Sequence, residues 1–356
     1  MARPRARELG IIIGELPTGT YNAITDVAGV RVGHTTLISG EGALVPGHGP
    51  VRTGVTVILP HGDSLFREKV PGAVHTINGY GKPLGFEQVR ELGEIESPIA
   101  LTNALNVGLV ADALVQHAVC LSPEIGIRTT SVNVVVAECN DGYLNDLQGR
   151  HVRAEHVFAA LASAAGGPVA EGGVGGGTGM TCFGWKGGIG TASRVVPADA
   201  GGFAVGALVQ SNFGWPRDLI LAGDPVGRRL RPPPVAQDKG SIVTVLATDA
   251  PLDARQLGRL AVRAGAGLAR VGGHFGHGSG DFVIAFSTAQ RIPHAPGALT
   301  AARTVVADEG AVMAWLFPAA VEAVEEAVVN ALCVAETMAG RDGHVSHALP
   351  VAEVMR

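Results

Sequence analysis

The 356-residue sequence is poor in charged and aromatic residues, which make up 17% and 4% of the chain. Its 27 lysine and arginine residues stand against 32 acidic residues, so the net charge is −5, and the basic residues are scattered along the chain. A protein that binds nucleic acid concentrates basic residues on one surface. We therefore expect no nucleic-acid partner.

Long hydrophobic runs are also missing. No stretch reaches the roughly 18 uninterrupted apolar residues that a transmembrane helix needs. The basic first residues are followed by only a short apolar run at 11–13, which is too short for the core of a signal peptide. These observations predict a cytoplasmic protein that has no membrane partner.

Cysteine is scarce, with four residues at Cys120, Cys139, Cys182 and Cys333 and no C-x-x-C pair. Neither a zinc knuckle nor a disulfide scaffold is indicated by such spacing. We expect four small buried residues in a reducing compartment.

Glycine is the residue in excess, with 51 copies, whereas average usage is about 7%. Disorder is excluded because hydrophobic residues make up 46% of the chain and follow strand and helix periodicities. Strands are predicted at 55–59, 131–137, 188–196, 203–210, 242–247 and 282–287, and helices at 107–119, 154–165, 253–271 and 318–339. This order predicts a layered α/β domain with an antiparallel core.

The last predicted helix has the clearest pattern. Pro318 suits a first helical turn, and Gly340 suits the end. Its acidic residues, Glu322, Glu325 and Glu326, are predicted to form a solvated face.

Two glycine-rich stretches could form a nucleotide-binding or a metal-binding site. The segment 171–194 lacks the spacing of a Walker or dinucleotide loop, so its glycines indicate close backbone packing. His274 and His277 could ligate a metal, but no third ligand is near them. Ser279 and Asp281 stand two apart at the entry to a strand, where a hydroxyl and a carboxylate would face one site, although an ordinary turn explains them equally well.

Two further polar positions follow predicted strands. Glu138 ends a buried strand before an Asn140-Asp-Gly turn, where a carboxylate could bind a substrate ammonium or be a solvated loop charge. Asn212 lies just past another strand, where its amide could stabilise an oxyanion or cap a turn.

The proline-rich, basic segment 228–239 is expected to be exposed and mobile, and it meets a β-branched strand at the Gly240–Ser241 bond. Either a loop simply ends there, or the chain is cut at this bond and Ser241 becomes an N-terminal nucleophile.

The motifs together resemble the DmpA-type family of L-aminopeptidase/D-esterase-amidases, which includes the β-peptidyl aminopeptidases. The resemblance runs from near residue 20 to near residue 340 and rests on the stretches YNAITDVAGVRVGHTTL, VTVILPH, PIALTNALNVG, ECNDGYLND, GGGTGMTCFGWKGGIGTASR, LVQSNFG, GSIVTVLATDAPL, GSGDFVIAFSTA and EAVEEAVVNAL. It implies that the chain cuts itself between Gly240 and Ser241 and that the freed α-amino group, with an ordinary pKa of about 7.7–8.0, is the base for the Ser241 hydroxyl.

The same resemblance implies the other site residues. Asn212 corresponds to the oxyanion donor, Ser279 to the serine that orients the nucleophile, and Glu138 to the carboxylate that binds the substrate's amino group. Asp281 is implied to be catalytic, since it stands where family members carry a glutamate that relays or orients protons. Asn140 is implied to be a substrate-binding residue, at a position where they carry a tyrosine.

The implied fold is a four-layer α-β-β-α sandwich of two packed sheets. We expect one hydrolase domain over residues 1–356, cut into a large subunit, 1–240, and a small subunit, 241–356. The implied function is release of N-terminal residues from short peptides, amides or esters, with no metal or organic cofactor and with αβ pairs assembled into a homo-oligomer. Two alternatives stay open: another N-terminal-nucleophile amide hydrolase or acyltransferase that acts on amine-blocked substrates, and an uncut, non-catalytic small-molecule binding protein.

Overall fold

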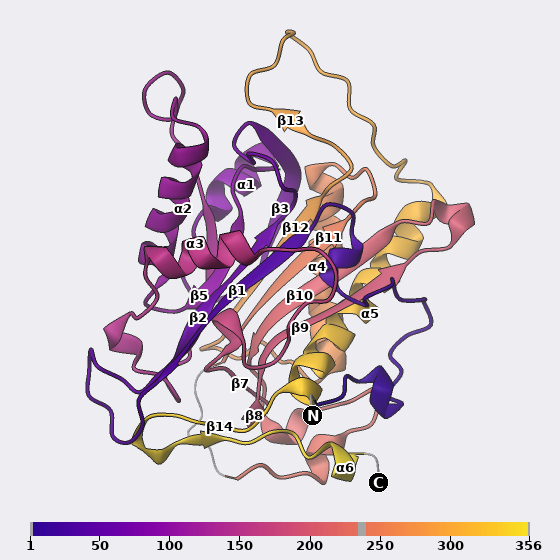
Figure 1. Cartoon of the computed structure of the whole chain (residues 1–356). Coiled ribbons are helices and arrows are strands. Elements are labelled where there is room, and N and C mark those ends of the chain that lie inside the picture. Colours follow the sequence, from indigo (N-terminus) through magenta and orange to yellow (C-terminus); the bar gives the residue numbers. More distant parts are fainter. Residues whose placement is uncertain (1–2, 234–239, 355–356) are drawn as a thin grey trace.

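A computed structural model describes residues 3–233 and 240–354 of the chain, and these residues form two principal β-sheets (Figure 1). The first sheet has the strand order β1 (Arg31–Ser39), β2 (Val51–Leu59), β5 (Ile99–Asn103) and β6 (Val135–Cys139). The second has the order β13 (Ile292–Pro293), β3 (Glu68–Gly79), β12 (Gly280–Ser287), β11 (Ser241–Thr248), β10 (Ala204–Asn212) and β9 (Gly188–Val195), with β4 (Glu94–Ile95) paired to β3. Neighbouring strands in both sheets are antiparallel except in the pairs β5–β6 and β11–β12.

Helices cover the outer faces of the two sheets. One apolar cluster joins the first sheet to α2 (Val107–Leu121) and α3 (Ala154–Ser163), and another joins the second sheet to α4 (Ala254–Arg270) and α5 (Ala311–Val334). A third cluster lies between the sheets. The predicted four-layer α-β-β-α sandwich is therefore confirmed (Figure 1). Two short α-helices lie outside these layers, α1 (Phe86–Leu92) and α6 (Val351–Val354). Two small strand pairs are β7 (Thr181–Cys182) with β8 (Trp185–Lys186) and β14 (Met338–Ala339) with β15 (Val345–Ser346), and short 3-10 helices lie in the connections.

Strand β11 shows how the sequence encodes the layers. Its side chains alternate, so that Ile242 and Leu246 pack against the helices of the second sheet, whereas Val243 and Val245 pack between the sheets. Every residue of the strand is buried. A strand covered on both faces reads as a continuous apolar run, which is why this one was visible in the sequence.

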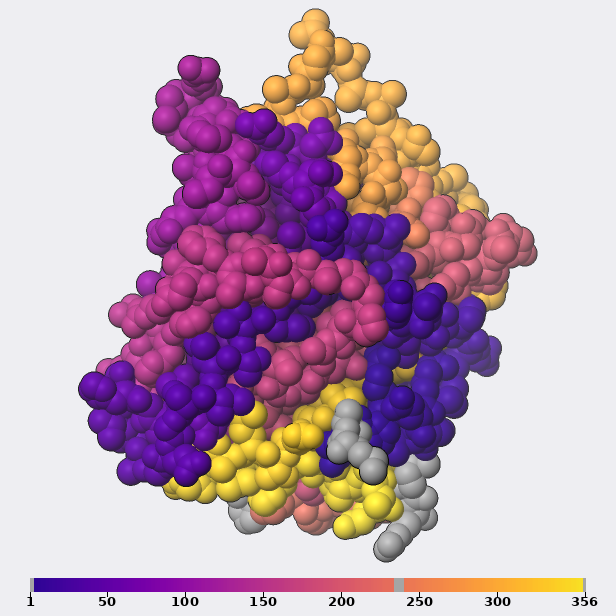
Figure 2. Space-filling model, viewed as in Figure 1, coloured from indigo at the N-terminus to yellow at the C-terminus, as the bar shows by residue number. Residues whose placement is uncertain are grey.

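Two segments project from the same end of the molecule. Figure 2 shows them as the tip that follows α2 and the segment that follows β13. Large apolar side chains, Ile127 and Leu299, are exposed on these segments. None of the helices formed by residues 3–233 and 240–354 combines the length and apolarity that a membrane span needs.

The prediction for the last helix was wrong in three respects, of which the first is its end: the helix stops at Val334, and Met338–Ala339 before Gly340 form strand β14. The helix α5 begins at Ala311, so Pro318 lies inside it instead of in its first turn, because the apolar residues before Pro318 continue the buried face. Its glutamates are not solvated: Glu322, Glu325 and Glu326 are all buried.

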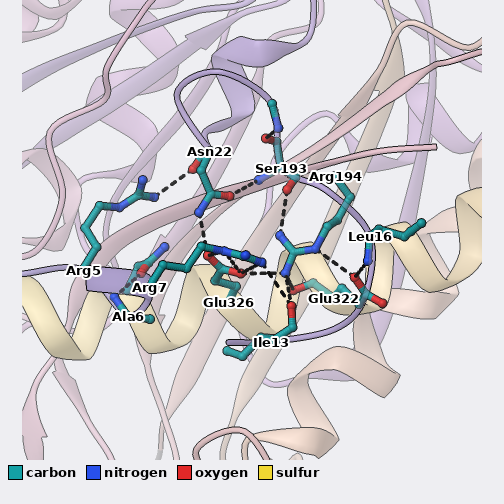
Figure 3. A network of polar contacts seen from close by, with 12 residues as sticks. Arg5, Ala6, Arg7, Ile13, Leu16, Asn22, Ser193, Arg194, Glu322 and Glu326 are labelled. Atoms are coloured by element: carbon teal, nitrogen blue, oxygen red, sulfur yellow. Dashed lines mark hydrogen bonds and ion pairs between the residues drawn. The ribbon is translucent and has the colours of Figure 1, made fainter. Parts of the chain in front are cut away.

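Arginines from distant parts of the sequence explain the buried glutamates (Figure 3). The fully buried Arg194 of β9 pairs through Nε with Glu322 Oε2 at 2.9 Å and through Nη2 with Glu326 Oε2 at 2.6 Å. Arg7 Nε lies 2.8 Å from Glu326 Oε1. Burial alone raises the pKa of Glu326, but the Arg7 hydrogen bond and the Arg194 charge outweigh it, so the pKa lies below its ordinary value. The network fastens the N-terminal segment and β9 to α5.

Other predictions need smaller corrections. Cys120 is exposed near the end of α2, whereas Cys139, Cys182 and Cys333 are buried as expected. The strands β1, β3 and β5 were not predicted. Of the segment 228–239, which was predicted to be exposed and mobile, residues 234–239 lie outside the described residues.

Candidate active site

Three adjacent strands of the second sheet bring the predicted catalytic residues to one place. Ser241 is the first residue of β11, where it lies opposite Asn212 in antiparallel β10 and opposite Gly280 in parallel β12. Ser279 and Asp281 flank Gly280. Asn212, Ser241, Ser279 and Asp281 are all buried. The site therefore lies at one end of the central strands.

Two N–H donors point at the Ser241 hydroxyl. Asn212 Nδ2 lies 3.3 Å from Ser241 Oγ, and the backbone nitrogen of Asn140 lies 3.4 Å from the same oxygen. Asn140 comes directly after β6, so the first sheet contributes one of the two donors. Paired donors beside a nucleophilic oxygen can stabilise the negative charge that forms on an attacked carbonyl oxygen.

The orientation of the Asn212 amide is set by its neighbours. Its Oδ1 accepts a 2.9 Å hydrogen bond from the backbone N–H of Thr181, and its Nδ2 donates a 3.0 Å bond to the Asn140 carbonyl. With the oxygen held by an N–H, the amide must turn its nitrogen toward Ser241. Thr181 was not among the predicted site residues, because it acts through its backbone and the sequence carries no signal for such a contact.

Ser279 and Asp281 form a direct pair. Ser279 Oγ donates a 2.7 Å hydrogen bond to Asp281 Oδ1, while Asp281 Oδ2 is buried without a hydrogen-bond partner among the described residues. Burial raises the pKa of Asp281 to about 6, and the Ser279 bond opposes part of that rise. The carboxyl group is thus mostly ionised at neutral pH and takes up a proton in mildly acidic solution.

Gly240 packs against this pair. Its φ is 73°, in the left-handed region that favours glycine. A Cβ added here would lie 3.3 Å from Ser279 Oγ. The Gly240–Ser241 bond is therefore next to the Ser279 hydroxyl.

Glu138, near the end of β6, has a cationic neighbour that the sequence did not reveal. Its Oε1 lies 3.1 Å from Lys82 Nζ and accepts a 3.3 Å bond from the Lys82 backbone N–H. The Glu138 side chain is 6% exposed and that of Lys82 is 55% exposed. A buried carboxylate that pairs with an exposed ammonium can exchange it for the ammonium of a ligand.

A cavity of about 440 Å³ opens beside Asn140. Tyr143, Asp146, Arg341 and His344 contribute to its lining. The rings of Tyr143 and His344 stack with centroids 4.5 Å apart. Asn140 is shared between the two places, because it lines this cavity and its backbone nitrogen lies 3.4 Å from Ser241 Oγ.

The two histidines considered as metal ligands lie outside this constellation. His274 Nε2 is 3.0 Å from Asp218 Oδ2. Within residues 3–233 and 240–354, no group of three or more His, Cys, Asp or Glu side chains is placed to hold a metal ion.

The site combines a serine hydroxyl at the start of a core strand with two N–H donors and a hydroxyl–carboxyl pair, and the two sheets around it are covered by helices. These features define a hydrolase of the N-terminal nucleophile type. Residues 22–346 match the model of Peptidase family S58. The β-peptidyl aminopeptidase BapA of Sphingosinicella microcystinivorans is 45% identical over 99% of this chain and 91% of its own length.

Two solved structures are similar along nearly their whole length. The PH0078 protein from Pyrococcus horikoshii OT3 has a TM-score of 0.95 and 51% identity, and the match covers 99% of this chain and 98% of that one. The L-aminopeptidase D-Ala-esterase/amidase from Ochrobactrum anthropi, a serine aminopeptidase and a variant of the N-terminal nucleophile hydrolase fold, has a TM-score of 0.91 and 43% identity over 99% and 97% of the two chains.

The chain belongs to Peptidase family S58, as the resemblance of its motifs implied. It is a hydrolase and an aminopeptidase. The alternatives of an enzyme restricted to amine-blocked substrates and of a non-catalytic binding protein do not fit these relatives.

Proposed function

We propose that the chain cuts itself between Gly240 and Ser241 and that Ser241, as the first residue of the fragment 241–356, is the nucleophile that releases N-terminal residues from short peptides, amides or esters. The observation that carries this proposal is the convergence of Asn212 Nδ2 and the Asn140 N–H on Ser241 Oγ, at 3.3 and 3.4 Å. The cut frees an α-amino group next to the hydroxyl, which supplies a base near neutral pH.

In the self-cleavage step, Ser241 Oγ attacks the Gly240 carbonyl carbon and the acyl group moves from the Ser241 nitrogen to its oxygen. Water then hydrolyses the ester, leaving Gly240 with a carboxylate and Ser241 with a free amine. Ser279, which lies against Gly240, and Asp281 are placed to assist proton transfer before that amine exists.

In turnover, the Ser241 amine accepts the proton of the attacking hydroxyl and passes it to the leaving amine. Asn212 and the Asn140 N–H stabilise the oxyanion, and the acyl-enzyme ester is hydrolysed by water. Glu138 binds the substrate ammonium in place of the Lys82 ammonium. Specificity for the N-terminal residue follows, because an acylated amine carries no charge for Glu138.

Covalent capture tests this proposal. The enzyme is mixed with an L-aminoacyl ester, a D-alanyl amide and a β-peptide, each as the free amine and as its N-acetyl form, and quenched in acid. We expect a mass increase of one acyl group on the Ser241 peptide with at least one free-amine substrate and none with the N-acetyl partners. Turnover without that adduct, or equal turnover of the acetylated forms, would contradict the assignment.

We also propose a cytoplasmic homo-oligomer of cleaved pairs. The four cysteines form no disulfide, as in proteins of reducing compartments. Ile127, 79% exposed, and the fully exposed Leu299 lie on the two projections of Figure 2, where apolar side chains suit contact with a second copy. Light scattering after size exclusion tests this: Ile127→Asp with Leu299→Asp should lower the molar mass, and a wild-type mass equal to one chain would contradict it.

A further inference from the structure

A lysine side chain lies fully buried beside the candidate active site. Lys186, the second residue of β8, is 0% exposed. Its Nζ donates to the carbonyl oxygens of Gly177, Met180 and Gly187 at 3.2, 2.9 and 2.7 Å. An ammonium group has three N–H donors, so these contacts use all of them. All three acceptors are backbone carbonyls, and none is a carboxylate.

Placing a cation there is unfavourable. Removing an ammonium from water without a carboxylate partner costs several kcal/mol. Burial lowers the pKa of Lys186 to about 7, and Cys182 acts in the other direction. An apolar side chain of similar length would fill the same space without this penalty. Lysine therefore differs from such an apolar side chain by its three N–H donors.

The donors bind the inside of a loop whose outside is held by other elements: the backbone nitrogens of Phe183 and Lys186 donate to the carbonyls of Phe213 and His347, each at 2.7 Å. Residues 177–187 include four glycines, and Gly184 and Phe183 both have positive φ. Glycine-rich backbone loses much conformational entropy when it is ordered. The Met180 carbonyl oxygen also accepts a 3.0 Å hydrogen bond from the Gly187 N–H. The Lys186 ammonium and the Gly187 backbone therefore bind the same carbonyl.

The residue after Met180 contacts the oxyanion donor. The Thr181 N–H donates to Asn212 Oδ1 at 2.9 Å, and Asn212 Nδ2 lies 3.3 Å from Ser241 Oγ. The Met180 carbonyl and the Thr181 nitrogen belong to the same peptide unit, so fixing one fixes the other. If this N–H moved away, the 3.0 Å bond from Asn212 Nδ2 to the Asn140 carbonyl would have to hold the amide without it, and an amide that turned its oxygen toward Ser241 would cost the site a donor.

We infer that Lys186 is a positioning residue for catalysis, which holds the Met180–Thr181 peptide unit so that Asn212 presents its N–H to the oxyanion. The inference rests on the proposed function of Ser241 and Asn212. It assigns Lys186 no contact with the substrate, so it predicts an effect on kcat that passes entirely through Asn212.

A double-mutant cycle tests this coupling. The four proteins are wild type, Lys186→Met, Asn212→Ala and the double variant, with kcat and KM measured per mole of 241–356 fragment. We expect Lys186→Met alone to lower kcat about tenfold or more, the scale of a damaged oxyanion donor, with KM changed less than about twofold. In the Asn212→Ala background the same change should alter kcat less than about twofold.

Lys69→Met is the matched control. Lys69 is also a mostly buried lysine, 12% exposed, but it pairs with Glu94 and Glu96 at 3.3 and 3.0 Å. Its loss should lower thermal stability and affect kcat equally in both backgrounds. An equal kcat loss for Lys186→Met in both backgrounds, or no loss at all, would overturn the inference.

Two provisions keep the result decisive. If Lys186→Met does not fold, Lys186→Gln, which keeps two donors, enters the same cycle with the same expectations for coupling. If a variant is cut too slowly to give enough of the 241–356 fragment, the cycle is measured on the rate of self-cleavage, for which we expect the same oxyanion donors to act. A wild type that is neither cut nor active contradicts the proposed function, whereas an active wild type with an additive cycle contradicts only the inference about Lys186.

Discussion

Ser279 Oγ donates a 2.7 Å hydrogen bond to Asp281 Oδ1, and both side chains are buried beside the Gly240–Ser241 junction. The sequence placed them two apart at the entry to a strand, and the structure gives that spacing a physical meaning. A carboxylate whose pKa is raised to about 6 holds the hydroxyl in one orientation at neutral pH and weakens its hold in acid.

Asp281→Asn should therefore change stability and activity in opposite directions. Since the folded pKa of about 6 lies above the ordinary value of 3.8, the folded chain binds more protons between these values. The stability contributed by the group is then present below about pH 4 and lost as pH rises to about 6. In the Ser241→Ala background, where the chain stays uncut, denaturant unfolding should show that Asp281→Asn raises the free energy of unfolding more at pH 7 than at pH 4, by up to about 3 kcal/mol.

The activity of Asp281→Asn should fall at least about tenfold at pH 7, the lower part of the range for residues that assist proton transfer. In wild type, protonation of Asp281 below about pH 6 should steepen the acid limb of the kcat profile. That steepening should vanish in the variant. An unchanged acid limb would show that Asp281 is not the group that titrates there.

Glu138→Gln should weaken turnover of free-amine substrates by about 1.5–3 kcal/mol in kcat/KM, the range for a hydrogen bond to a charged group. Self-cleavage should be normal, because the precursor presents no substrate ammonium. Equal effects on free-amine and acetylated substrates would contradict recognition of the amine by Glu138.

Lys82→Met should have the opposite effect on the binding of a substrate ammonium by Glu138. Lys82 Nζ lies 3.1 Å from Glu138 Oε1, so its ammonium competes with that of the substrate. Its removal should lower KM for free-amine substrates and leave kcat unchanged in steady-state assays. A raised KM would mean that Lys82 positions Glu138 instead of competing for it.

Arg194→Met should destabilise the chain by about 3–5 kcal/mol, the cost of removing one partner from a buried ion pair. The measurement belongs in the Ser241→Ala background, where an uncut chain unfolds as one molecule. Arg255→Met is the control, because Arg255 pairs with Asp308 at the surface, where such pairs contribute little to stability. Similar losses for both variants would show that the network of Figure 3 adds no unusual stability.

The sequence predicted the parts of the site that use side chains at the ends of apolar strands. Ser241, Asn212, Ser279 and Asp281 all lie where a β-branched run begins or ends, and the paired strands bring them together. The Thr181 N–H could not be predicted in this way, since a backbone contact leaves no signature in residue type. Lys82 was also missed, because a partly exposed lysine far from Glu138 in sequence has no distinguishing pattern.

The burial of Glu326 shows a different limit. Charged residues at helical spacing usually face water, and the arginines that reverse this expectation, Arg7 and Arg194, lie 319 and 132 positions away along the chain. Strand β3 was missed because Pro71 and Gly72 interrupt its apolar pattern, although β12 pairs along it. Partners far away in the sequence, and not local propensity, determine both the burial of Glu326 and the formation of β3.

Ser241→Ala and Ser241→Cys separate self-cleavage from cutting by another protease. Ser241→Ala should stay intact and inactive, because one hydroxyl serves both reactions. Ser241→Cys should retain some self-cleavage, since a thiol can attack the Gly240 carbonyl, and should turn over substrate poorly. An alanine variant cut at this bond would point to an outside protease, and one that is intact yet active would move the nucleophile elsewhere, with Ser279 as the next candidate.

The central claim is that Ser241 becomes the first residue of a separate chain, and denaturing mass spectrometry of freshly purified wild-type protein tests it most directly. The account predicts two species, with the masses of residues 1–240 and 241–356, that co-purify before denaturation and separate after it. N-terminal sequencing of the smaller species should begin Ser-Ile-Val. A single species with the mass of the intact chain, in a preparation that hydrolyses aminoacyl substrates, would contradict the account.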